Sequence, residues 1–321
     1  MIKLGIIGTG YISNIHTIAA KDLDNVSISS VFSRDRNNAK KFAEKYKIPN
    51  YYDNYNALLD SDVDAVIIGV PTTLHKDFSI KALKKFKHVL CEKPISLNIS
   101  DAFEMQKAFQ QSKKILMIAH VLRFWAEYVT VKKMMDDGAL GNIRKIYAYR
   151  FASIPKWSKN NWLLNQDMSG GVPIDLQIHD VDYILWLLGE PKKYYSTGVS
   201  NVEGLIVNSS TVFQYNQATA VAEAGYVLAK GFRFEMGFKI ITDSVVLDYS
   251  NLREPTLLIE KTGKPPEAIQ FENYNAYRNQ VSYFVECIKH NRQPEKIKLS
   301  DAIKSLQLSI NIKLSILRNT D

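Results

Sequence analysis

The first third of the chain alternates short apolar runs with amphipathic segments, and this pattern constrains the fold more than any other feature. The predicted strands cover residues 2–8, 26–32, 64–70, 88–93 and 115–120, and the segments between them have the spacing of helices. Strands that alternate with helices indicate a parallel sheet that is covered on both faces. We therefore predict an α/β fold that begins with a doubly wound parallel sheet.

The pattern changes after His120. A predicted helix is followed by a long strand over 142–154, and further β-branched and aromatic runs extend to about residue 250. Helices are predicted near 274–290 and 299–318. We expect this half to form a second α/β domain with a large, mostly antiparallel, open-faced sheet.

The length of 321 residues fits two domains. We predict a first domain over residues 1–122 and a second domain over 123–321. The hydrophobic content of 46% and charged content of 23% are those of an ordinary soluble protein.

The net charge of +8 is spread over scattered lysines rather than gathered in a basic tract. This distribution favours solubility and attraction for anionic cofactors over binding of nucleic acid. Cys91 and Cys287 lie far apart and match neither a disulfide framework nor a metal site. The chain shows no signal peptide and no apolar run of membrane-spanning length. We expect a cytoplasmic protein with no membrane or nucleic-acid partner.

The first predicted strand runs directly into a glycine turn. The turn consists of Gly8, Thr9, Gly10, Tyr11, Ile12 and Ser13. Gly8 permits a tight turn, and Gly10 lets the backbone approach a pyrophosphate at the N-terminus of the following helix. Because it stands at the first strand-to-helix turn of an alternating pattern, this turn predicts a dinucleotide site.

The end of the second predicted strand indicates which dinucleotide binds. An acidic residue here would bind the ribose 2′-hydroxyl of NAD, but the chain has Ser33 and Arg34. A hydroxyl and a guanidinium suit a 2′-phosphate better, so NADP(H) is favoured slightly over NAD(H). In the alternative interpretation, Ser33 or Asp35 only caps the next helix.

Later strand ends should face the same ligand, because open α/β sheets bind ligands at the carboxyl ends of their strands. The candidate cofactor contacts there are Val70, Pro71, Thr72, Leu74, His75, Glu92 and Lys93. A lysine at a strand end beside a cofactor can also take part in chemistry, so Lys93 is the most informative of them.

Residues 170–188 read as a mostly buried helix that nevertheless carries an imidazole and several carboxylates. On one continuous helix, Asp175, His179 and Asp182 share a face, while Asp180 points elsewhere. Because the unperturbed pKa of histidine suits proton transfer near neutral pH, we predict that His179 is a general acid/base. Asp182 either fixes the imidazole tautomer or caps a neighbouring element, and Asp180 has no assigned role. With no cysteine or second histidine nearby, we predict no metal.

Several motifs together are more specific than the glycine turn alone. The segments GTGYIS, VPTTLH, EKP, RFWAEY…GALGNI and GGVPIDLQIHDVD occur in this order. With them, nearly the whole chain resembles the glucose–fructose oxidoreductase / inositol dehydrogenase (Gfo/Idh/MocA) family.

The resemblance implies an NAD(P)-dependent oxidoreductase that acts on the CH–OH group of a sugar, a cyclitol or a derivative. It maps the family's EKP lysine onto Lys93 and its aspartate and histidine onto Asp175 and His179. We expect Lys93 to hold and polarise the substrate oxygen and Asp175 to bind a substrate hydroxyl or orient the pair. The resemblance also implies that residues 1–122 form a Rossmann dinucleotide-binding domain and that residues 123–321 serve substrate binding and oligomerisation, with a homodimer or homotetramer formed through the C-terminal sheet.

Substrate contacts are further expected from the region before the Gly170–Gly171 turn and from the start of the second domain. The candidates are Arg123, Trp157, Lys159, Asn160, Asn161 and Trp162. Aromatic rings can stack on sugar faces, and amides and charges can bind hydroxyls.

Three other interpretations were weighed. Tyr128 and Lys132 match the Y-x-x-x-K spacing of short-chain dehydrogenases, but the glycine spacing differs, so Tyr128 is predicted to be a packing residue. The chain could instead catalyse glycoside cleavage or epimerisation through transient oxidation with a bound nucleotide. It could also be a non-catalytic sensor of nucleotide or sugar, although a sensor has no need of Lys93, Asp175 and His179.

Overall fold

The computed structural model describes residues 1–155, 158–227, 229, 231–271 and 274–318. The chain forms two compact units. The first comprises Met1–Phe124, Ser158–Asn160 and Asn275–Lys304, and the second comprises Trp125–Trp157, Asn161–Tyr274 and Ser305–Asp321. The first unit thus extends beyond the predicted N-terminal segment, because α10 (Ala276–Lys289) packs against α1 (Tyr11–Lys21).

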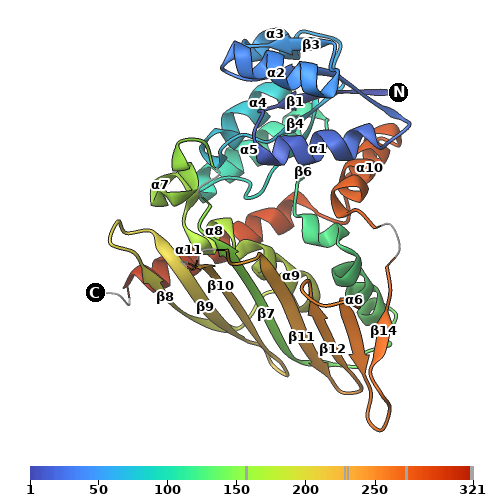
Figure 1. The fold of residues 1–321 in the computed structure, drawn as a ribbon, viewed down its shortest axis with the longest axis vertical. Coiled ribbons are helices and arrows are strands. Elements are labelled where there is room, and N and C mark those ends of the chain that lie inside the picture. Colours follow the sequence, from blue (N-terminus) through green and yellow to red (C-terminus); the bar gives the residue numbers. More distant parts are fainter. Residues whose placement is uncertain (156–157, 228, 230, 272–273, 319–321) are drawn as a thin grey trace. The chain divides into compact units, whose positions relative to one another are not determined.

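The first unit is built on a six-stranded parallel sheet in the order β3-β2-β1-β4-β5-β6 (Figure 1). Its strands are β1 (Ile2–Ile7), β2 (Val26–Phe32), β3 (Asn50–Tyr52), β4 (Ala65–Ile68), β5 (His88–Cys91) and β6 (Leu116–Ile118). Its other helices are α2 (Arg36–Tyr46), α3 (Tyr55–Leu59), η1 (Thr72–Leu74), α4 (His75–Lys84), α5 (Ile99–Ser112) and η2 (Val121–Phe124). The prediction of a doubly wound parallel sheet is confirmed.

The direction in which strands are added reverses between β1 and β4. In open parallel sheets, ligands bind beyond the carboxyl ends of the strands at such a switch point. Gly8 follows β1 and Gly69 follows β4, so these two glycines mark that place in the first unit.

The second unit is built on an eight-stranded sheet in the order β14-β13-β12-β11-β7-β10-β9-β8. Every neighbouring pair is antiparallel except β7 and β10, as predicted for this half. The strands are β7 (Ile143–Ser153), β8 (Lys193–Ser200), β9 (Ile206–Gln214), β10 (Thr219–Val227), β11 (Glu235–Thr242), β12 (Val246–Ser250), β13 (Leu257–Glu260) and β14 (Glu267–Ile269).

Helices pack on one face of this second sheet. The helices of the unit are α6 (Ala126–Asp136), α7 (Gln166–Ser169), α8 (Val172–Asp175) and α9 (Ile178–Leu188). Helix α8 packs on β9 and β10, and α9 packs on β7 and β10. Two helices have residues in both units, namely η3 (Lys159–Leu164) and α11 (Leu299–Arg318).

The predicted helix over residues 173–188 is not continuous, which corrects the sequence analysis. It divides into α8 and α9 with a turn at Leu176 and Gln177. The backbone N–H of Gln177 donates to the carbonyl of Val172, five residues earlier, so the turn is wider than an α-helical one. The expectation that Asp175 and His179 share a helix face assumed one continuous helix, so it does not apply to these two residues.

Tyr128 is fully buried among aromatic rings. Its ring centroid lies 4.6 Å from that of Tyr183, 5.1 Å from that of Phe238 and 5.4 Å from that of Tyr249. Aromatic pairs at these separations stabilise a core beyond the area that they bury. Tyr128 is thus a packing residue, as predicted. Within the described residues, no helix is long and apolar enough to cross a membrane.

Candidate functional site

The glycine turn packs α1 tightly against the end of β4. Gly8 has a φ of +104°, and a Cβ atom on it would lie 2.6 Å from the carbonyl oxygen of Gly69. A Cβ on Gly69 would lie equally close, 2.6 Å, to Oγ of Ser13, which itself donates to the Gly69 carbonyl at 3.3 Å. These positions require glycine for the fold of the turn, and Ser13 is the small residue that lets α1 approach β4.

Gly10 differs from both of these glycines. It is exposed at the N-cap of α1 with an ordinary φ of −80°, and a Cβ placed on it would meet nothing within 4 Å. Gly10 has no side chain that could cap α1, and the first N–H groups of an α-helix have no acceptor within the helix, so they can donate to a ligand. An open cradle at the N-terminus of an eleven-residue helix fits a dinucleotide pyrophosphate.

The contrast between the glycines gives a prediction. Gly10→Ala should leave the thermal stability of the protein nearly unchanged and weaken NADP⁺ binding at least about tenfold, because the methyl group fills space only where a ligand approaches. Gly8→Ala should instead lower the melting temperature, because it places Cβ against the Gly69 carbonyl. Differential scanning fluorimetry and cofactor titration measure the two effects. Equal affinities of Gly10→Ala and wild type for NADP⁺ would contradict the cradle.

Of the residues that follow β2, Asp35 caps the next helix and Arg34 is an exposed cation. Asp35 is the N-cap of α2, since its Oδ1 accepts from the backbone N–H groups of Asn37 and Asn38 at 2.9 and 3.1 Å. Oγ of Ser33 accepts from the N–H of Asp35 at 3.3 Å. The capping alternative therefore holds for Asp35, while Arg34 lies exposed beside it.

His75 organises the ends of two strands. It is 1% exposed, its Nδ1 lies 2.8 Å from the carbonyl oxygen of Pro94, and its Nε2 lies 3.0 Å from that of Val70. Burial lowers the pKa of His75 below its ordinary value, although the two carbonyl groups oppose this shift. A neutral imidazole carries a single N–H, so His75 donates to one of these two carbonyls while its ring packs between the loops after β4 and β5. Its role as a cofactor contact stays a prediction.

Glu92 is engaged in the same way. Its Oε1 lies 2.6 Å from Nε2 of the fully buried His16 on α1, and its Oε2 accepts from the backbone N–H of Lys93 at 3.1 Å. Burial acts to raise the pKa of Glu92, but the hydrogen bond and charge of His16, with the charge of Lys93, bring it below its ordinary value. The carboxylate joins α1 to the loop that carries Lys93. Its role as a direct cofactor contact stays a prediction.

In the second unit, Asp175 and His179 lie on either side of the turn that separates α8 from α9. Asp175 is the last residue of α8, and its Oδ2 accepts a hydrogen bond from the hydroxyl of Tyr226 on β10 at 2.8 Å. His179 lies in the first turn of α9 and is half-buried.

Gln177, between these two residues, anchors the turn to the sheet. Its side chain is fully buried, and its Nε2 donates to the carbonyl of Ala222 at 2.8 Å. Its Oε1 accepts from the hydroxyl of Ser209 at 2.8 Å. The backbone between Asp175 and His179 is thereby fixed to β9 and β10. The sequence offered one signal for this role, a polar amide within an apolar stripe.

The two carboxylates without an assigned role bind elements of their own unit. Asp180 pairs with Arg150 of β7, with Nε–Oδ2 and Nη2–Oδ1 distances of 3.0 Å each, and both side chains are almost completely buried. Burial acts to lower the pKa of Arg150, but the facing Asp180 raises it above its ordinary value, so the guanidinium stays charged. Asp182 accepts from the hydroxyl of Ser305 on α11 at 2.9 Å. These contacts fasten α9 to its neighbours, and for Asp182 they favour the anchoring alternative.

The remaining candidates for substrate contacts fall into three groups. Arg123 is buried, and its Nη1 donates to Oδ2 of Asp301 and to the carbonyl of Lys296, both at 2.9 Å, so its charge is matched within the first unit. Asn160, Asn161 and the half-buried Trp162 lie on η3. Trp157 and the side chain of Lys159 lie outside the described residues.

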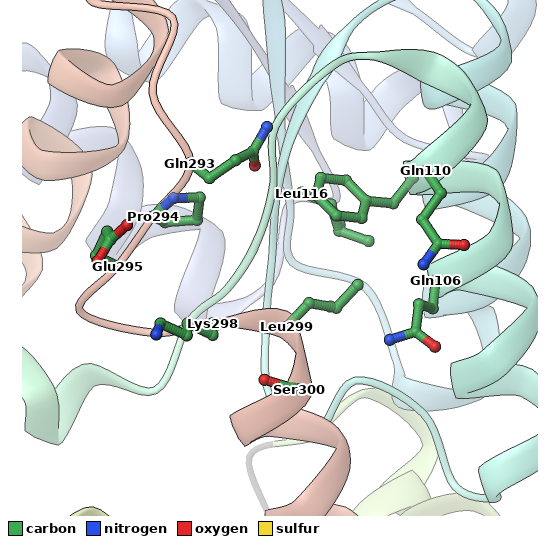
Figure 2. Close-up of a pocket in the computed structure, with 10 residues that line it drawn as sticks. Gln106, Gln110, Leu116, Gln293, Pro294, Glu295, Lys298, Leu299 and Ser300 are labelled. Carbon is green, nitrogen blue, oxygen red and sulfur yellow. The ribbon is translucent and has the colours of Figure 1, made fainter.

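Figure 2 shows a separate apolar hollow in the first unit, with a volume of about 260 Å³. It is lined by Gln106, Phe109, Gln110, Leu116, Gln293, Pro294, Glu295, Lys298, Leu299 and Ser300. Leu116 is the first residue of β6, so the hollow does not lie at the carboxyl end of that strand. None of the predicted cofactor or catalytic residues lines it.

Two family models match the chain. Residues 2–120 match the model described as "Oxidoreductase family, NAD-binding Rossmann fold", and residues 128–242 match the GFO/IDH/MocA C-terminal domain. Together these matches cover most of both halves of the chain.

Individual relatives agree with the family models. The chain is 32% identical over 191 residues to 2,7-anhydro-N-acetylneuraminate hydratase of Escherichia coli, covering 59% of this chain and 50% of that protein. It is 27% identical over 227 residues to scyllo-inositol 2-dehydrogenase (NADP(+)) IolU of Bacillus subtilis, covering 69% of each. The chain thus spans half of the first of these relatives and about two thirds of the second. The fold resembles that of levoglucosan dehydrogenase in complex with NADH and L-sorbose, with a TM-score of 0.88, 17% identity and coverage of 99% and 97%.

Proposed function

Because the chain belongs to the GFO/IDH/MocA family of NAD-binding oxidoreductases, we propose that it transfers a hydride between NADP(H) and a secondary alcohol or ketone of a sugar, cyclitol or sugar derivative. The observation that carries the proposal is the open cradle at Gly10 beside the β1–β4 switch point, with Lys93 following β5 of the same sheet. The inositol and levoglucosan dehydrogenases among the similar proteins support the substrate class.

In this proposal, residues of the chain bind the substrate and transfer its hydroxyl proton. The bound nicotinamide supplies the hydride acceptor or donor. Lys93 binds the reacting oxygen and stabilises negative charge that develops on it. His179 accepts the hydroxyl proton in oxidation and returns it in reduction, and Asp175 accepts a hydrogen bond from a second substrate hydroxyl. Thr72 and the backbone of Val70 and Pro71 follow β4 and contribute to the cofactor side.

A panel assay tests this function. Purified protein is incubated with NADP⁺ or NAD⁺ and with inositols, aldoses and anhydrosugars, and reduced nicotinamide is followed by its absorbance. The proposal expects net reduction of the cofactor with at least one of these polyols. A panel without any cofactor reduction, in either direction of the reaction, would contradict it.

A second candidate is an enzyme that oxidises its substrate transiently and returns the hydride, with no net redox change. The relative named as a hydratase, at 32% identity, favours this alternative. Such an enzyme would consume an anhydrosugar or glycoside without net change in nicotinamide absorbance. Chromatography of the products in the same assay separates the two functions.

The preference for NADP(H) rests on the end of β2. Arg34 is exposed, and no carboxylate takes the place that binds a ribose 2′-hydroxyl, because Asp35 is used as the cap of α2. A guanidinium binds a 2′-phosphate through charge-assisted hydrogen bonds.

Arg34→Ser should therefore weaken NADP⁺ binding by about 10- to 100-fold and leave NAD⁺ binding within about twofold, because only the phosphate contact is lost. Isothermal titration with each cofactor measures both effects. Arg36→Ser is the matched control, since Arg36 already pairs with Asp53 at 3.4 Å and lies over the Tyr51 ring at 5.4 Å. Equal losses for both cofactors in Arg34→Ser would contradict the preference.

We also propose self-association through the face of the second sheet opposite α8 and α9. Alternate residues on this face carry large side chains that are half-buried or exposed: Tyr147, Tyr149, Phe151, Val212, Val221 and Ile241. Aromatic and apolar side chains on an open sheet face are typical of protein interfaces. Sedimentation velocity should show a dimer or tetramer, and a monomer at micromolar concentration would contradict the proposal.

A cytoplasmic location is part of the same proposal. Cys91 and Cys287 are both buried free thiols. Unpaired cysteines are usual in a reducing compartment.

A further inference from the structure

Tyr226 lies on β10 with its ring in an apolar cluster of the second unit. The ring is 7% exposed and packs with the buried side chains of Val172, Leu176, Leu205 and Ala224. Two of these neighbours, Val172 and Leu176, lie at the ends of the short α8 segment that carries Asp175. The packing therefore fixes the ring relative to the backbone of Asp175.

The hydroxyl of Tyr226 is a hydrogen-bond donor to the Asp175 carboxylate. It donates to Oδ2 of Asp175 at 2.8 Å, the length of a good O–H···O bond. Burial, followed by the charge of Asp175 and the hydrogen bond itself, raises the pKa of Tyr226 well above its ordinary value. The phenol therefore remains a protonated donor throughout the range in which enzymes work.

Asp175 is held from two directions. Its backbone N–H donates to the carbonyl of Gly171 at 2.9 Å, which fixes its main chain in the turn of α8. Tyr226 fixes one carboxylate oxygen, and an ionised carboxylate offers about four lone-pair sites in all. The bond from Tyr226 uses one of these sites, so it orients the carboxylate without using up its capacity to accept from a ligand.

We propose that Tyr226 is a positioning residue for substrate binding: it holds the Asp175 carboxylate in the orientation that accepts a hydrogen bond from a substrate hydroxyl. The inference rests on the proposed function, because it requires that Asp175 binds a polyol. Tyr226 acts through Asp175 and has no chemical step of its own. Its loss should therefore raise KM more than it lowers kcat.

A double-mutant cycle with Tyr226→Phe and Asp175→Asn tests the inference, with NADP⁺ and the polyol that the wild type oxidises fastest in the panel. Tyr226→Phe keeps the ring in the cluster and removes only the hydroxyl. It should lower kcat/KM by about tenfold, mostly through KM, the size expected for a hydrogen bond to a charged group. In the Asp175→Asn background the same change should lower kcat/KM less than about twofold, because the group through which Tyr226 acts is already altered.

Two control variants separate this role from a structural one. Leu205→Val disturbs the same apolar cluster without removing a hydroxyl, and Tyr215→Phe removes a phenol that donates to the Gly189 carbonyl at 3.1 Å. Both should leave KM unchanged. If Tyr226→Phe is too unstable to assay, Tyr226→Met replaces it in the cycle, because methionine fills the cluster without a hydrogen-bond donor, and Leu205→Val remains the control for altered packing.

Each outcome decides between the claims. If Asp175→Asn loses activity but Tyr226→Phe or Tyr226→Met matches the wild type, the inference is wrong and the proposed function stands. If the hydroxyl loss costs the same factor in both backgrounds, Tyr226 does not act through Asp175. If Asp175→Asn is as active as the wild type, or if no polyol of the panel is oxidised, the proposed role of Asp175 fails and the inference fails with it.

Discussion

Lys93→Met should lower kcat/KM for the polyol substrate by about 10²- to 10⁴-fold while NADP⁺ binds within about threefold of wild type. Methionine keeps the length of the side chain but removes the positive charge that the reacting oxygen requires. The backbone of residue 93 should stay in place, because its N–H bond to Glu92 and the Glu92–His16 pair do not depend on the lysine side chain. Steady-state kinetics and cofactor titration measure the two quantities.

Lys76→Met is the control for Lys93→Met. Lys76 lies in the same unit and pairs with Asp101 at 2.6 Å and with Glu104 at 3.4 Å. Its loss should change neither kcat/KM nor cofactor binding. If Lys93→Met is as active as Lys76→Met, Lys93 takes no part in the proposed chemistry. If Lys93→Met loses cofactor binding and activity to the same extent, Lys93 is a cofactor contact only.

Arg150→Gln should reduce the free energy of unfolding by about 3–5 kcal/mol, because it leaves the Asp180 carboxylate buried without its charged partner. Asp180 is completely buried and Arg150 is 3% exposed, so water cannot replace the lost bonds. The melting temperature should fall by roughly 10 °C. Chemical denaturation followed by circular dichroism, together with calorimetry, measures the change.

Arg144→Gln is the matched comparison on the same strand. Arg144 also pairs with an aspartate, Asp243, at 2.6 Å, but both side chains are well exposed and such pairs contribute little. Its replacement should leave the melting temperature nearly unchanged. The double variant Arg150→Met with Asp180→Leu should recover most of the stability, because it removes both charges. Equal destabilisation by Arg150→Gln and Arg144→Gln would mean that the buried pair does not anchor α9.

The architecture of both units was predictable because it depends on periodicity. Each apolar run of the first third became a strand of the parallel sheet, and the runs between residues 142 and 250 became strands of the mixed sheet. Short elements escaped prediction: β3 and β14 have three residues each, too few to show a period. The sequence also did not predict that residues 275–304 belong to the first unit, because the pattern of an amphipathic helix does not indicate which surface the helix packs against.

The cofactor side of the site was partly predictable. The glycine turn, Ser33 and Arg34 lie at strand ends as expected, since a motif at a known place in an alternating fold has a defined position. His75 and Glu92 are predicted ligand contacts, and the structure adds that their side chains lie against Val70, Pro94 and His16, which no pattern in the sequence indicated. A sequence shows that a polar residue lies at a strand end, but it does not show whether neighbouring groups already form hydrogen bonds with that residue.

The substrate side depended on contacts that no local pattern encodes. Asp180, Asp182 and Gln177 looked alike as polar residues in an apolar stretch, yet their partners lie on β7, α11, β9 and β10. The break between α8 and α9 was missed because its residues, Leu176 and Gln177, are good helix formers. Tyr226 lies about fifty residues from Asp175, so only the pairing of β10 within the sheet brings it near.

The central claim is net hydride transfer from a polyol carbon to the nicotinamide. It is tested most directly with myo-inositol and the other active polyols carrying deuterium on their ring carbons, with mass spectrometry of the cofactor and of the product. The account predicts one deuterium on each reduced cofactor molecule and an oxidised product in equal amount. A product that keeps or regains the label while the cofactor ends unreduced would contradict it.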